Sequence, residues 1–129
     1  MFLKGFFVLI STLVFSSAFA AKIECTAQVF ESLPNGSNRH MSVPLTVEKE
    51  TAQSITLTAD LDGKGFTLSG DKENGPYLVS ITDEPDYTKG SLTTASFSPE
   101  GRLQLSVVVQ TLVHKLECFK SPTTSSLSK

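Results

Sequence analysis

The sequence predicts one all-β domain, either an antiparallel β-sandwich or a small up-and-down β-barrel of about seven or eight strands. Short runs of alternating apolar and polar residues recur along the chain, and turn-forming residues separate them. No segment after residue 20 has the helical period of an amphipathic helix. The only two cysteines, Cys25 and Cys118, lie near opposite ends of the predicted domain.

Residues 1–20 are predicted to be a cleaved signal peptide rather than part of the domain. Lys4 precedes an apolar run over residues 6–15, and Ala18 and Ala20 occupy the small-residue positions before a cut after Ala20. The apolar run is shorter than the roughly 20 residues that span a bilayer, so no membrane span is expected after cleavage. The predicted location is therefore periplasmic or secreted.

The remaining chain divides into a predicted all-β domain over residues 21–120 and a tail over residues 121–129. The tail is polar and low in complexity, which predicts disorder. The whole chain has a formal net charge of −2 and no tryptophan. This composition provides no basic surface for nucleic acid and few aromatic rings on which bases could stack.

The two cysteines are expected to form one disulfide, because an exported chain matures in an oxidising compartment. Cys25 lies on the apolar face of a predicted strand over residues 22–30. Cys118 ends the longest β-forming run, residues 103–118. The bridge is therefore predicted to join the first strand of the domain to the last.

Asp62-Gly63 predicts a two-residue hairpin turn with a defined register. This turn places Leu57 opposite Leu68 and Ala59 opposite Phe66, so that apolar residues meet on one face.

Two further strands are predicted around this hairpin. The first covers residues 40–48 and places Met41, Val43, Leu45 and Val47 on one face. Pro44 falls on the other face and places the strand at a sheet edge or at a bulge. The second covers residues 76–82, with Tyr77 on its inward face.

The turn at residues 98–102, with Gly101 in a left-handed conformation, predicts a second hairpin. Its register would place Phe97 opposite Leu103 and Ala95 opposite Leu105.

The inward-facing positions then change from odd to even numbers after Val109. Gln110-Thr111 contains no usual turn residue, so a β-bulge that bends one long strand is expected there instead of a tight hairpin.

Two groups of residues are candidates for a site. Asp83, Glu84 and Asp86 lie beside Tyr87 in an acidic connection, where they could form a weak cation site, a patch for a basic partner, or simply a solvated loop. The second group consists of His114 and Tyr77, which are predicted to point inward. They are either hydrogen-bonded core residues or polar contacts in a cavity. No catalytic, cofactor or metal-binding motif is found.

These observations favour a non-enzymatic protein-binding module, an accessory or inhibitor-like protein whose partner is another envelope or extracellular protein. The strand with Pro44 and the loop over residues 83–87 are the expected contact surfaces. One alternative is a small β-barrel that carries an apolar ligand against His114 and Tyr77. The other is a hydrolase that uses a pair of carboxylates.

Overall fold

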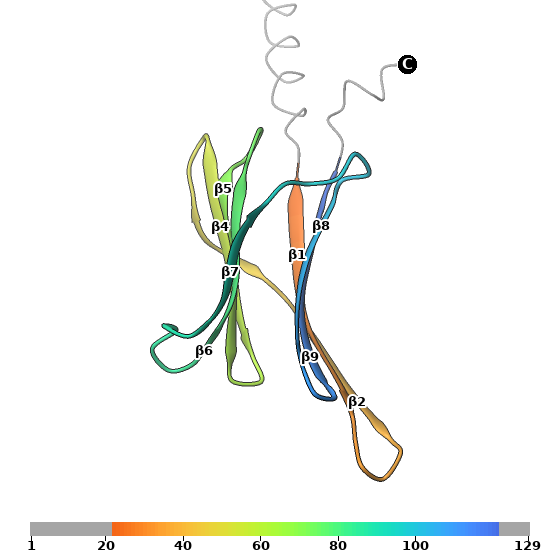
Figure 1. The fold of residues 1–129 in the computed structure, drawn as a ribbon. Coiled ribbons are helices and arrows are strands. Elements are labelled where there is room, and N and C mark those ends of the chain that lie inside the picture. The colour runs from red at the N-terminus through yellow and green to blue at the C-terminus, as the bar shows by residue number, and fades with distance from the viewer. Residues whose placement is uncertain (1–21, 122–129) are drawn as a thin grey trace, which may run out of the picture.

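The protein is a two-sheet β-sandwich in the computed structural model, which describes residues 22–121 (Figure 1). The predicted all-β class is confirmed, and the two separate antiparallel sheets decide for the sandwich over the barrel. One sheet has the strand order β2-β1-β9-β8, and the other has the order β3-β4-β5-β6-β7. The predicted signal peptide and residues 122–129 of the predicted tail lie outside the described residues.

The nine strands of the described chain follow one another with short connections. Their bounds are β1 (Ile23–Ser32), β2 (Asn38–Pro44), β3 (Thr46–Glu50), β4 (Ser54–Leu61), β5 (Lys64–Asp71), β6 (Tyr77–Asp83), β7 (Gly90–Ala95), β8 (Arg102–Val109) and β9 (Leu112–Lys120).

The core lies between the sheets. It is built from every second residue along the strands, as the period-two pattern predicts. Phe66, Leu68 and Val79 from one sheet meet Ala27 and Leu116 from the other, and all of them are fully buried. Burial of these apolar side chains is the main favourable contribution to folding.

The predicted disulfide is confirmed, since Cys25 of β1 is bonded to Cys118 of β9. The two residues are direct partners in the register of the antiparallel pair β1–β9. The bond closes a sequence separation of 93 residues, worth about 4–5 kcal/mol on the chain-entropy model. Beyond it, the Ser121 N–H donates to the Lys22 carbonyl at 2.9 Å, so the ends of the described chain lie side by side.

The predicted hairpin at Asp62-Gly63 is confirmed in detail. Leu57 pairs with Leu68 and Ala59 pairs with Phe66. Asp62 and Gly63 have φ values of 57° and 74°, the signs that a type I′ turn requires at both central positions.

The predicted strand over residues 40–48 is instead two strands in different sheets. The chain crosses at Leu45, whose buried N–H donates to the Cys25 carbonyl at 2.9 Å (Figure 1). Pro44 ends the edge strand β2, as its missing N–H predicts. Val47 pairs with the buried Leu57 and so shares its face, but β3 is an edge strand with a bulge after Val47, and Val47 is 54% exposed there.

The bent strand predicted across Gln110-Thr111 is also wrong, because β8 and β9 form a tight hairpin there. Val109 pairs directly with Leu112 across the two-residue turn. In such a hairpin an odd-numbered residue faces an even-numbered one, and this accounts for the change in numbering of the inward positions. Gln110 has φ +56°, which the first central position of the turn requires and which glycine usually provides.

The predicted pairing of Ala95 with Leu105 is not formed. The turn at residues 98–102 does exist, with the Ser98 N–H donating to the Arg102 carbonyl at 2.8 Å. However, Ala95 pairs with Tyr77 in the five-stranded sheet, whereas β8 belongs to the other sheet. The turn therefore connects the two sheets instead of closing a hairpin.

Gln110→Gly is expected to raise the free energy of unfolding by about 1 kcal/mol, because glycine adopts a positive φ without the cost that a side chain imposes. Urea unfolding at neutral pH measures the change. Gln104→Gly, in the middle of β8, is the matched control and should destabilise the protein. Equal destabilisation by both substitutions would contradict the strain assigned to Gln110.

Candidate functional site

The two interior candidates are buried, and both have protein partners. The hydroxyl of Tyr77 donates to the Lys72 carbonyl at 3.1 Å, and its ring packs edge-on against Phe97. His114 Nε2 lies 3.0 Å from Asp62 Oδ2. Tyr77 and His114 are 2% and 3% exposed. Their polar atoms are engaged within the protein, which favours hydrogen-bonded core residues over contacts to a ligand.

Asp62 connects the two sheets at one end of the sandwich. From the turn between β4 and β5 it contacts His114 on β9 and also accepts from Arg39 on β2 at 3.3 and 3.4 Å. Arg39 in turn lies 2.7 Å from Glu31. The hydrogen bonds from Arg39 lower the pKa of Asp62 most, against the opposing effect of partial burial, and the His114 contact lowers it further.

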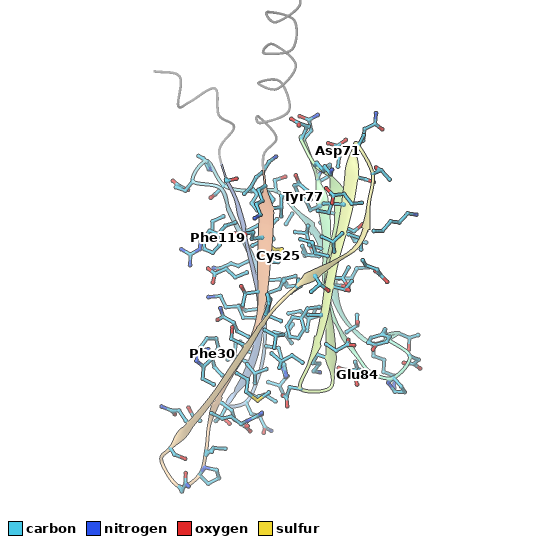
Figure 2. All side chains as sticks on the ribbon, turned by 180° about the vertical axis from the view of Figure 1, so that it is seen from behind. Cys25, Phe30, Asp71, Tyr77, Glu84 and Phe119 are labelled. Carbon is cyan, nitrogen blue, oxygen red and sulfur yellow. A yellow bond between two sulfur atoms is a disulfide. The ribbon has the colours of Figure 1, made fainter. Side chains whose placement is uncertain are left out.

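The acidic candidates do not converge on one point. Asp83 is paired with Lys64, and this ion pair lowers the pKa of Asp83. Asp86 Oδ1 accepts from the Thr88 N–H at 3.3 Å, an ordinary arrangement within a loop. Glu84 is exposed at one end of the sandwich (Figure 2), and its N–H donates to the carbonyl of Gly63 in the adjacent turn at 3.0 Å. Across residues 22–121, no group of three or more acidic, histidine or cysteine side chains is arranged to hold a metal ion.

The sandwich has four edge strands, and β8 is the longest of them. Natural edges are protected by proline, charge, bulges or short length. β2 ends in Pro44, β3 has a bulge and the charged run 48–50, and β7 has only six residues. Residues 103–109 of β8 contain no charge, proline, glycine or register shift. This edge is therefore open to another strand.

The register of the β8–β9 hairpin identifies the free backbone groups. Because Val109 and Leu112 flank a two-residue turn, they exchange both hydrogen bonds, and alternate residues of β8 then do the same. The intervening residues, Gln104, Ser106 and Val108, direct their N–H and C=O groups away from β9. Arg102 belongs to this outward set, and its carbonyl accepts from the Ser98 N–H at 2.8 Å, which ends the open stretch.

An apolar row leads across the outer face of the four-stranded sheet to this edge. His40 pairs with Phe30, Phe30 with Val113, and Val113 with Val108. The Phe30 and His40 rings stack with centroids 4.5 Å apart. Phe30 points away from the other sheet in Figure 2. Val108, at the open edge, is 63% exposed. The exposed row and the free backbone groups together form a single candidate binding surface.

Comparisons with known proteins leave this surface to be interpreted from its own geometry. No family model, curated protein or solved structure matches the chain. Within the part of the chain that the structure describes, no helix is long and apolar enough to cross a membrane.

Neither the edge nor the Asp62 contacts were predicted from the sequence. From the sequence, β8 was predicted to be the first half of one long bent strand over residues 103–118, and Asp62 was predicted only as a turn residue. The uncharged run over residues 103–109 was the available signal for the edge.

Asp62→Asn is expected to lower the free energy of unfolding at pH 7 by about 1.5–3 kcal/mol, the range for a hydrogen bond to a charged group. Asparagine tolerates the positive φ of the turn, so the substitution tests the carboxylate alone. Because the pKa of Asp62 is lowered by folding, its stabilisation is present at neutral pH and is lost as the pH falls through the folded-state pKa. The difference from wild type should shrink between about pH 5 and pH 2.

Denaturant unfolding across this pH range provides the measurement. Glu100→Gln, at an exposed turn, is the matched control and should behave like wild type at every pH. A difference for Asp62→Asn that stays constant down to pH 2 would contradict the role of its charge.

Proposed function

We propose that this protein is an exported, non-enzymatic binding module that captures an extended segment of another protein by strand addition to β8. The observation that carries the proposal is the open edge over residues 103–109, which lacks the protective features of the other three edges. In this mode of recognition, backbone hydrogen bonds provide affinity and alternate side chains provide selectivity.

The chemistry of the edge specifies the partner segment. Its free groups at Gln104, Ser106 and Val108 require an extended backbone, and the absence of charge on residues 103–109 favours an uncharged segment. Val108 ends the apolar row, so an apolar side chain placed beside it would gain hydrophobic contact. This interpretation moves the expected contact surface from Pro44 and the loop over residues 83–87 to β8.

Export is supported by the predicted signal peptide over residues 1–20 and by the Cys25–Cys118 bond. Structural disulfides persist in the periplasm and outside the cell and are rare in a reducing cytosol. The partner is therefore proposed to be an envelope or extracellular protein.

The two alternatives receive less support from the geometry. A carrier needs an enclosed barrel, whereas the strands form two separate sheets with core side chains between them. For a carboxylate-dependent hydrolase, a pair of carboxylates must face a substrate. Of the carboxylates at the end of the sandwich near the Asp62 turn, Asp62 and Asp83 are each paired with a cationic side chain. A binding role requires neither feature.

Ser106→Pro is expected to abolish strand addition while the domain stays folded, because the N–H that proline removes points to the open edge. The probe is a labelled peptide with the β8 sequence RLQLSVVV, which meets the stated partner chemistry over its uncharged residues. Fluorescence anisotropy should show saturable binding to wild type and at least tenfold weaker binding to Ser106→Pro. Val108→Lys, which adds the charge that natural edges use, should have the same effect.

Leu105→Pro is the contrasting variant, since its N–H bonds to β9 and its loss should unfold the domain. Circular dichroism checks the fold of each variant. Equal peptide binding by wild type, Ser106→Pro and Val108→Lys would overturn the proposal, as would no binding at all. Sedimentation of wild type and Ser106→Pro then shows whether a second copy of this chain supplies the added strand.

The exported form is expected to begin at Ala21, because Ala18 and Ala20 define the predicted cut. Intact-mass measurement of protein from the periplasmic fraction or the medium tests this expectation. A product that retains residues 1–20 would contradict it.

A further inference from the structure

The outer face of the five-stranded sheet contains a groove of about 510 Å³ on the opposite side of the molecule from the apolar row. Its floor consists of hydroxyl side chains from three neighbouring strands: Thr58 pairs with Thr67, and Thr67 with Ser80. Thr82, on the same strand as Ser80, extends this floor. The groove is of the size that small-molecule sites usually have.

Ser80 is the unusual member of this floor. It is only 8% exposed although it lies on the outer face of the sheet and lines the groove. Among residues 22–121, no protein group forms a hydrogen bond with the Ser80 hydroxyl, and the same is true of the hydroxyls of Thr58, Thr67 and Thr82. Buried polar groups are almost always hydrogen-bonded to protein or to water, so a hydroxyl that lines a groove and has no protein partner is available to bond to a ligand there.

Tyr87 forms one wall of the groove and is held there by unusual local structure. Its φ of +58° is rare for a bulky residue, and its N–H donates to the Asp83 carbonyl at 2.8 Å. The ring covers Gly65, where an added Cβ would lie 2.7 Å from Tyr87 Cε1. The Tyr87 hydroxyl donates to Asp60 at 3.4 Å. The side chain is nevertheless 45% exposed, so part of the ring remains available to a ligand.

The lining residues define the chemistry of that ligand. Two carboxylates, Asp60 and Glu48, lie at the groove and no lysine, arginine or histidine lines it, which disfavours an anion. Serine and threonine hydroxyls both donate and accept, so they match a ligand rich in hydroxyl groups. Tyr87 and the exposed Leu92 add apolar surface that can pack against the C–H face of a ring.

We infer that this groove is a binding site for a neutral saccharide, in which the Ser80 and threonine hydroxyls bond to sugar hydroxyls and Tyr87 packs against a sugar ring. The site lies in the other sheet from β8 and does not depend on strand addition.

The inference is tested by NMR titration of the full mature domain with three neutral trisaccharides: chitotriose, cellotriose and maltotriose. At least one of them should give saturable amide shifts that are confined to residues lining the groove. Tyr87→Ala should weaken its affinity at least tenfold, and Ser80→Ala should weaken it severalfold. Gly65→Ala keeps every polar group but displaces the Tyr87 ring, so it should also weaken binding about tenfold.

Thr56→Val is the matched control. Its hydroxyl already bonds to Ser69 at 2.9 Å and lies one row away from the groove, so affinity should be unchanged. Ser106→Pro should also bind the saccharide normally, which separates this result from the fate of the β8 proposal. Absence of localised shifts with all three sugars would overturn the inference. Unchanged affinity in Tyr87→Ala, with the fold intact, would do the same.

Discussion

The pairing of β1 with β9 is the interaction on which the rest of the structure depends. It brings the first and last strands together along nine residue pairs, and Cys25–Cys118 fixes it covalently. Within this sheet β2 pairs only with β1, and β8 pairs only with β9. The four-stranded sheet therefore cannot form unless β1 and β9 pair. Such a contact between distant segments carries a large loop-closure cost, which the disulfide reduces once it has formed.

The two sheets offer different chemistry on their outer faces. Phe30 and Val108 belong to an apolar row on one sheet, whereas the other presents the hydroxyls of Thr58, Thr67 and Ser80. Successive side chains of a strand point to opposite faces of its sheet. The inward residues therefore build the core, and the outward residues determine the chemistry of each outer face. A small sandwich can thus combine the proposed protein-binding edge with the proposed saccharide groove on the other sheet.

The sequence predicted the features that depend on neighbouring residues or on strong chemistry. Asp62-Gly63 determined one hairpin and its register, and two cysteines in a chain with a predicted signal peptide indicated the bridge. Prediction from the sequence failed where contacts between distant segments determine which strands pair. The alternation of apolar and polar residues is the same whichever sheet a strand joins. The crossing at Leu45 and the partner of Ala95 are of this kind. The turn at Gln110 was missed because the hairpin forces a positive φ on a residue that rarely adopts one. Tyr87 was a candidate only as a neighbour of the acidic residues, because its position over Gly65 depends on the folded loop.

The hydrogen bond between Ser121 and Lys22 has a practical consequence for the orientation of the molecule. Both ends of the described chain leave from one pole of the sandwich, while Glu84 and the acidic connection lie at the other (Figure 2). A tag, surface anchor or fused domain attached at either end therefore holds the protein by the same pole. The opposite pole, with the turns at Asp62-Gly63 and Gln110-Thr111 and the loop that bears Tyr87, then faces outward in either attachment.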